Sequence, residues 1–465
     1  MSNTISQTDQ TARTSAETST IRERSNGLSI VAKILLTLII IAHPLFYFSM
    51  FAGDAEIHLV YGMNSAQGNY FEYNVGEKSA GVTSPGYMLF IAAFFKTLPD
   101  SVVPLAVKLT NLLFWYLLVI LTFRLVREFE AGSFWSWTMA TLVALMPGTV
   151  YNATLGMENG IFGALFVFWF LVAIRWKWFH QWGESTGKEL LIGLLLGALL
   201  WIRPEGFVLA AIAFSFRLPL LIRSLRSSSG AIFHPIIRML YSALPVIILS
   251  ALYFYFHYSQ TGHLLPQSGV SRVIMGAQNS IQIGGLALNT KFVRFFIFYF
   301  PLTIAMVAGL RATLTNREAN EVNTINHYFL VATLAIFFVL YSSILSAHHF
   351  SRYTIFLMPV IVVYAGVGAR WISARLLTGR FGLARNSVLL IGSVSVTILC
   401  ILFASEIYLR QQSGSNYPFG NLWKAMDAPE NRKDFSDKLY ASLGKPGQLP
   451  ISLAYVEVQI RYHLD

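Results

Sequence analysis

Residues 51–88 read FAGDAEIHLVYGMNSAQGNYFEYNVGEKSAGVTSPGYM and form a polar segment directly after an apolar run. The segment holds four acids, Asp54, Glu56, Glu72 and Glu77. Its glycines, its asparagines and the Thr-Ser-Pro-Gly sequence at 83–86 are typical of turns. We therefore expect a structured polar loop beside a hydrophobic body, in which Glu77 lies in a turn and Glu72 is solvated.

The composition indicates a membrane protein. Of the 465 residues, 55% are hydrophobic and only 12% are charged, whereas about a quarter of the residues of an ordinary soluble domain are charged. Apolar runs of about 20 residues with few interior charges are typical of transmembrane helices. The predicted fold class is an all-α polytopic membrane protein.

The apolar runs predict about 11 transmembrane helices. The run 87–95 is too short to span, and we interpret it as an interfacial or re-entrant helix over the first loop. The run 189–202 is also short, so it can share a bent span with its neighbour. The predicted spans are 28–51, 102–123, 134–152, 159–174, 189–202, 206–222, 239–257, 292–310, 328–347, 353–369 and 387–408.

The distribution of Lys and Arg sets the orientation. With a cytoplasmic N-terminus, the inner connections carry more Lys and Arg than the outer ones, as the positive-inside rule requires. We expect residues 1–27 to be a disordered cytoplasmic tail, 28–408 a transmembrane catalytic module with a first outer loop at 52–101, and 409–465 a small extracytoplasmic tail.

The composition argues against nucleic-acid binding and against sites built from cysteines. The net charge is +11, but the basic residues stand singly or in small groups at the ends of apolar runs, which does not favour nucleic-acid binding. The single cysteine, Cys400, lies in an apolar run and excludes disulfides and cysteine metal sites.

Asp54 and Glu56 are the candidate catalytic residues, because they come directly after the first span on the predicted outer side. A carboxylate there could act as the general base that deprotonates a hydroxyl. The simpler alternative is that both acids merely end the helix at the water interface.

The GMEN and RPEG turns also fall on the outer side. Glu158 and Asn159 could each bind a sugar or a metal, although an acid at a helix N-terminus also simply complements the helix dipole. Arg203 could bind a phosphate with its planar fork, with Glu205 contacting substrate. Alternatively, the arginine and this glutamate form an internal ion pair that makes the turn.

Two later outer loops add candidates. His263 and Gln267 could contact a sugar or a phosphate, or belong to an ordinary polar loop. His348, His349 and Arg352 would suit a phosphate group, with interfacial anchoring as the alternative. The sequence has no P-loop, GxGxxG, HExxH or GxSxG motif, so any donor is expected from the membrane or from the outer side.

The order of these motifs resembles the GT-C membrane glycosyltransferases, particularly bacterial enzymes similar to arabinofuranosyltransferase B and the protein O-mannosyltransferases. The resemblance covers about residues 30–370. The matching elements are Gly53-Asp54-Ala55, Tyr61-Gly62-Met63-Asn64, Gly68 to Asn74, Gly76-Glu77, Gly81-Val82-Thr83-Ser84-Pro85, Gly156-Met157-Glu158, Arg203-Pro204-Glu205-Gly206 and Gly262 to Gln267.

This resemblance implies an inverting enzyme in the bacterial inner membrane that works in cell-envelope polysaccharide biosynthesis. The donor would be a polyprenyl-phosphate sugar, and the acceptor an extracytoplasmic glycan, lipid or protein. Asp54 would be the catalytic aspartate of the first loop and act as the general base. Arg203, His348, His349 and Arg352 would hold the donor phosphate.

The sequence departs from the family at Gly53, where relatives often carry a second acid. A divalent cation such as Mg²⁺ or Mn²⁺ would therefore need Glu56 or Glu158 beside Asp54. The alternative function is a transporter or flippase of lipid-linked glycan intermediates. That alternative predicts charged groups near the bilayer midplane and an inverted repeat, and neither is evident. An O-antigen polymerase or ligase would place its key residues in one large loop instead.

Overall fold

The computed structural model describes residues 37–48, 53–129, 131–183, 185–227, 233–264, 266, 280–283, 286–289, 296–297, 299–315, 321–344 and 350–378. The chain divides into two units, Met1–Phe46 and Tyr47–Asp465. In the first unit, residues 37–42 are helical. The expectations for 1–27, 387–408 and 409–465 concern residues outside the described ranges.

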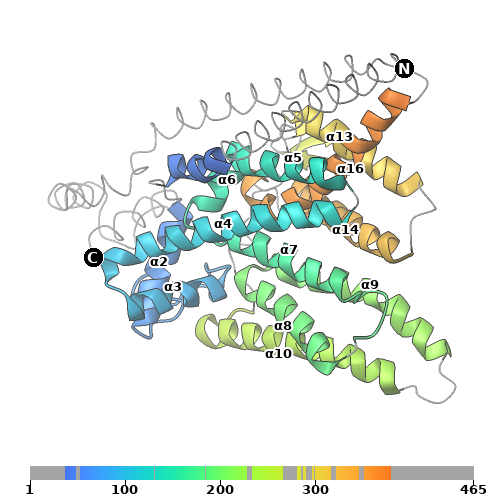
Figure 1. Cartoon of the computed structure of the whole chain (residues 1–465). Helices are drawn as coiled ribbons and strands as arrows, with labels where there is room; N and C mark the ends of the chain where they lie inside the picture. Colours follow the sequence, from blue (N-terminus) through green and yellow to red (C-terminus); the bar gives the residue numbers. More distant parts are fainter. Residues whose placement is uncertain are drawn as a thin grey trace, which may run out of the picture. The chain divides into compact units, whose positions relative to one another are not determined.

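The second unit is built mainly of helices (Figure 1). Short 3₁₀ turns precede α4 (Asp100–Val102) and α16 (Ile355–Leu357), and a π-helical turn (Leu340–Ile344) follows α14. The helices are α2 (Gly53–Ala66), α3 (Pro85–Thr97), α4 (Val103–Glu128), α5 (Gly132–Leu145), α6 (Pro147–Thr154), α7 (Asn159–Arg175), α8 (Thr186–Ile202), α9 (Glu205–Ser227), α10 (Phe233–Thr261), α13 (Phe300–Thr315), α14 (Glu321–Val339), α15 (Phe350–Tyr353) and α16 (Met358–Thr378).

One element departs from the all-α expectation. Strands β1 (Ser280–Ile283) and β2 (Leu286–Asn289) pair antiparallel, with Ser280 opposite Asn289 and Ile283 opposite Leu286. The chain is therefore a helical protein with a small β-hairpin.

Among the described residues, five helices are long and apolar enough to cross a membrane: Asp100–Glu128, Glu205–Arg226, Phe233–Thr261, Thr324–Ser342 and Ile355–Leu376. The pair α6 and α7 makes a sixth candidate if it is one broken span. The prediction of a multi-pass helical membrane protein is confirmed. The predicted count of about 11 spans is not reached within the described residues.

The predicted span 134–152 is two helices, because Pro147 interrupts it. Proline has no N–H to donate and disfavours helical geometry in the residue before it. Met146 is accordingly extended, and α6 starts with Pro147 at its first turn. A second break follows, since α6 and α7 are bent by 105°.

Small residues allow the helices to approach closely. Helix α8 packs on α10, and α13 packs on α16 (Figure 1). A Cβ atom added at Gly193 in α8 would lie 2.1 Å from the carbonyl oxygen of Ser242 in α10. Close contacts between small residues are how helices in lipid gain packing energy.

The polar segment after α2 folds back on its own backbone. Asn64 donates from Nδ2 to the carbonyl oxygens of Glu72 and Tyr73, at 2.9 and 3.0 Å. The Glu72 carboxylate lies 2.9 Å from Lys78 Nζ and accepts a bond from the Gly76 amide at 2.6 Å. These bonds lower the pKa of Glu72, the amide bond most of all. The expectation that Glu72 is solvated was wrong: it is buried and holds the loop together.

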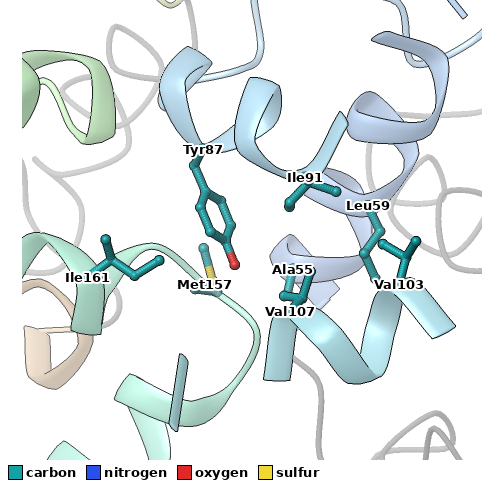
Figure 2. Packing of buried hydrophobic residues seen from close by; sticks show 8 residues of the cluster. All are labelled: Ala55, Leu59, Tyr87, Ile91, Val103, Val107, Met157 and Ile161. Atoms are coloured by element: carbon teal, nitrogen blue, oxygen red, sulfur yellow. The ribbon is translucent and has the colours of Figure 1, made fainter. Parts of the chain in front are cut away.

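An apolar cluster packs α2 and α3 against α4 and the start of α7 (Figure 2). It consists of Ala55 and Leu59 of α2, Tyr87 and Ile91 of α3, Val103 and Val107 of α4, Met157 just before α7 and Ile161 in the first turn of α7. Helix α3 has 13 residues, too few to cross a bilayer that needs about 20. It packs against α2 and against the turn before α7, and both of these segments carry polar residues.

Candidate functional site

Helix α2 presents acids in its first turn, where they complement the helix dipole. Asp54 and His58 are four residues apart and so lie on one face of the helix. The Asp54 side chain keeps 33% of its surface exposed, whereas Glu56 is buried. Asp54 is therefore the acid of this pair that a substrate can reach.

Asp54 forms an ion pair with an arginine that lies 298 positions later in the sequence. Arg352 NH1 of α15 donates to Asp54 Oδ2 at 2.5 Å. The ring centroid of Tyr353 lies 5.5 Å from the Arg352 guanidinium and 5.1 Å from that of Arg203. Tyr353 thus links this ion pair to a second group of charges.

Arg203 is the centre of that second group. Helix α8 ends at Ile202, Arg203 is extended, and α9 begins at Glu205 after a proline. The Arg203 side chain is buried and donates from all three of its nitrogens. Its Nε and NH2 reach Glu205 at 3.1 and 2.6 Å, and its NH1 reaches Glu158 at 2.8 Å and also the Asn159 side chain.

The group around Arg203 comes from three parts of the chain: the Arg203–Glu205 turn, the α6–α7 connection and the π-helical turn after α14. Glu158 and Asn159 stand where the bent α6–α7 pair turns. Tyr341, in the π-helical turn after α14, donates its hydroxyl to Glu205 at 2.8 Å. The two carboxylates outweigh the effect of burial on Arg203 and raise its pKa above the ordinary value. The guanidinium is therefore permanently charged and fixed between two acids.

His58 completes the group and was missed by the sequence analysis. Its Nε2 lies 3.5 Å from Glu158 Oε2, and its ring packs edge-on against Tyr87. Burial lowers the pKa of His58, although Glu158 and Asp54 oppose that shift. The signal in the sequence is the D-x-E-x-H spacing, which places the histidine one turn after Asp54.

Other predicted residues lie elsewhere. His263 is exposed just after α10, and its carbonyl oxygen is 2.8 Å from Nδ1 of the buried His257. Gln267, His348 and His349 lie outside the described residues. The structure therefore brings together Asp54, Glu158, Asn159, Arg203, Glu205 and Arg352, but not His263.

The donor set does not fit a divalent cation. In the described part of the chain, no group of three or more His, Cys, Asp or Glu side chains is arranged to hold a metal ion. The two carboxylates expected to bind one, Asp54 and Glu158, each lie within 2.8 Å of a guanidinium. A positive charge at that distance opposes a second cation.

Several buried polar atoms in this cluster have no hydrogen-bond partner among the described residues. They are His58 Nδ1, Asn159 Nδ2, Glu158 Oε2 and Arg352 Nε. An unmade bond at a buried polar atom costs about 1–3 kcal/mol, so such atoms are normally satisfied by water or a ligand. Asn159 Nδ2 and Arg352 Nε are donors, which suits a ligand with oxygen acceptors, such as a phosphate. Glu158 Oε2 is an acceptor, which suits a ligand hydroxyl, such as that of a sugar.

The known proteins found to be similar to this chain are solved structures. No protein-family model and no curated protein matches the chain. The archaeal oligosaccharyltransferase AglB from Archaeoglobus fulgidus, solved with an inhibitory peptide and a dolichol-phosphate, has a TM-score of 0.51 and 13% identity. That match covers 93% of this chain but 59% of AglB.

A second solved structure is similar to the same extent. ArnT from Cupriavidus metallidurans, bound to undecaprenyl phosphate, has a TM-score of 0.51 and 12% identity, and the match covers 93% of this chain and 75% of ArnT. Identities this low support a shared fold and nothing finer. The result concerns the fold alone and singles out no branch of the group that the sequence resembles. The chain thus has the membrane fold seen in AglB and ArnT.

Proposed function

We propose that the chain is an integral-membrane glycosyltransferase of the GT-C type, which transfers a sugar from a polyprenyl-phosphate donor to a hydroxyl of an extracytoplasmic glycan, lipid or protein. One observation carries this proposal: a buried cluster of acids and arginines with unpartnered donors stands beside the partly exposed Asp54. The fold supports it, because the structures of AglB and ArnT hold dolichol-phosphate and undecaprenyl phosphate.

Asp54 is the general base in this proposal. The acceptor hydroxyl gives its proton to the Asp54 carboxylate while its oxygen attacks the anomeric carbon of the donor sugar. The bond from that carbon to the phosphate oxygen breaks, and the lipid phosphate leaves with the electron pair. A single direct displacement of this kind inverts the anomeric configuration.

Arg352 is the residue we assign to the donor phosphate. Among the described residues, its Nε is buried without a hydrogen-bond partner, and its NH1 donates to the partly exposed Asp54. Guanidinium groups bind phosphate through paired N–H donors. His348 and His349, a few residues before it in sequence, remain proposed partners for the same phosphate.

Arg203 is not assigned to the donor phosphate, because its three nitrogens already donate to Glu205, Glu158 and the side-chain amide of Asn159. It would orient Glu158 and Glu205 toward sugar hydroxyls, with Asn159 Nδ2 as a further donor. Glu56, His263 and Gln267 remain proposed secondary contacts. No step is assigned to Mg²⁺ or Mn²⁺.

The proposed location is the bacterial inner membrane, with a cytoplasmic N-terminus and the site on the extracytoplasmic face. The lipid-linked donor would then approach from the bilayer and the acceptor from outside. Cell-envelope polysaccharide biosynthesis is the process such a reaction would serve.

The test uses the full chain in lipid vesicles with a radiolabelled polyprenyl-phosphate sugar and candidate acceptors. Asp54→Asn keeps the size of the side chain and removes the base, so we expect transfer to fall by about 10²–10⁴. Asp100→Asn is the matched control, because Asp100 is an exposed acid in the short turn before α4.

Two results would contradict the proposal. Full transfer by Asp54→Asn would remove Asp54 as the base. Movement of the labelled lipid across the vesicle membrane without transfer would favour the transporter instead.

A further inference from the structure

The connection between α6 and α7 is buried and sharply bent. Residues 155–158 are all shielded from solvent, and Gly156 has a φ of +83°, a conformation that favours glycine. The two helices meet at 105°. A bend of this kind leaves the last carbonyls of α6 without partners from their own helix.

Lys108 of α4 supplies a partner for the end of α6. It is 99% buried, and its ammonium group donates to the carbonyl oxygen of Thr154, the last residue of α6. It also donates to the carbonyl oxygen of Tyr47 at 3.3 Å. The last carbonyl oxygens of a helix have no partners within the helix, so a buried amine that donates to one of them suits this position.

Tyr87 of α3 binds a carbonyl two residues further along the chain. Its hydroxyl donates to the carbonyl oxygen of Gly156 at 2.7 Å and accepts a bond from Asn111 Nδ2 at 3.2 Å. Asn111 lies on α4, one turn after Lys108. Figure 2 shows the Tyr87 hydroxyl pointing toward the segment that carries Met157.

These bonds fix the residues that lead directly into the charged cluster. Glu158 follows Gly156 by two positions, and its carboxylate reaches Arg203 at 2.8 Å and His58 at 3.5 Å. The ring of Tyr87 also packs edge-on against His58, with 5.3 Å between the centroids. Tyr87 therefore contacts both the backbone that carries Glu158 and the side chain that faces it.

We propose that Lys108 and Tyr87 are positioning residues, which hold the bent α6–α7 connection so that Glu158 meets Arg203 and His58. The kinetic part of this inference rests on the proposed glycosyltransferase function. Its structural part does not, because the contact between Glu158 and Arg203 can be measured without turnover.

The decisive variant is Tyr87→Phe, which keeps the ring against His58 and removes the bond to Gly156. Tyr364→Phe is the matched control. Tyr364 is equally buried, and its hydroxyl also donates to a backbone carbonyl, that of His327 at 3.0 Å. It lies on α16, outside the cluster, so both variants lose one bond donated to a backbone carbonyl. Tyr87→Phe loses in addition the bond accepted from Asn111.

The first measurement is the coupling between Glu158 and Arg203. A double-mutant cycle with Glu158→Gln and Arg203→Met, read from unfolding in detergent, is run in the wild-type, Tyr87→Phe and Tyr364→Phe backgrounds. We expect the coupling to weaken in Tyr87→Phe alone. An unchanged coupling in Tyr87→Phe would overturn the inference, whether or not the wild type transfers sugar.

The second measurement is kinetic. We expect Tyr87→Phe to lower kcat by a few-fold to about tenfold, which is the worth of one hydrogen bond, with KM for the acceptor unchanged and Tyr364→Phe unaffected. In a Glu158→Gln background, Tyr87→Phe should cost much less, since it acts through Glu158. An undiminished kcat in Tyr87→Phe would show that the bond serves stability alone.

Lys108→Arg, which keeps a donor for both carbonyls, should retain more activity than Lys108→Met.

Discussion

Arg203 offers the strongest test of the charged cluster, because its guanidinium holds two buried carboxylates at once. Arg203→Met keeps much of the side-chain length and removes the charge and all three donors. Glu158 and Glu205 lie at 2.8 and 2.6 Å from Arg203 and are almost fully buried. The variant would leave both acids without their cation.

The expected loss is about 3–5 kcal/mol in the free energy of unfolding, the usual cost of removing one partner from a buried ion pair. We do not expect twice that loss, because Tyr341 still donates to Glu205 and His58 still lies beside Glu158. Adding Glu205→Gln to Arg203→Met removes one unpaired charge. The double variant should therefore recover about 1–3 kcal/mol.

The assay is unfolding of the purified protein in detergent, followed by circular dichroism as sodium dodecyl sulfate is increased. Arg375→Met is the control, since Arg375 is an exposed arginine whose guanidinium lies 4.1 Å from the ring centroid of Trp371. A cation–π contact at the surface is worth about 0.5–1 kcal/mol. The assignment of Arg203 as the centre of the cluster fails if its variant loses no more stability than the control.

Two further predictions concern pH and helix packing. Because the pKa of His58 is lowered from its ordinary value of 6.5, the unfolded chain binds more protons than the folded one, and stability should fall as pH drops from 6.5 to the lowered pKa. His58→Gln should flatten that part of a plot of melting temperature against pH, and an identical slope in the variant would contradict the shift. A Cβ at Gly368 of α16 would lie 1.8 Å from the carbonyl oxygen of Ala305 in α13, so Gly368→Ala should cost about 1–3 kcal/mol. Gly187→Ala, with nothing within 4 Å of the added atom, should cost nothing in the same unfolding assay, and equal effects would rule out the close helix contact.

The helices between residues 102 and 369 could be predicted because each apolar run is nearly long enough to span a bilayer. Their breaks were harder to place. Pro147 lies inside an apolar run and hardly changes its average hydropathy, so 134–152 was predicted as one span. In the structure this proline separates α5 from α6. Hydropathy averages over a window, whereas a helix break depends on one backbone N–H.

The long-range pairings within the site depend on tertiary structure and cannot be read from local spacing. Asp54 and Arg352 are 298 positions apart, and nothing in either neighbourhood specifies the other as its partner. The Arg203–Glu205 pair could be anticipated because the two residues share one turn. The contact of Glu158 with His58 could not, because it requires α2 to pack beside the bent connection before α7.

The distribution of charge explains why two arginines that looked equivalent in the sequence receive different roles. An anionic donor must compete with carboxylates for any guanidinium it approaches. At Arg203 it would have to displace two buried acids, each of which would then lack its cation at a cost of several kcal/mol. At Arg352 it would displace one acid, Asp54, whose side chain is already one-third exposed and can be solvated once released. Exchange at Arg352 is the less costly of the two, and it would release the Asp54 carboxylate from this guanidinium beside the reacting carbon, where a general base is required.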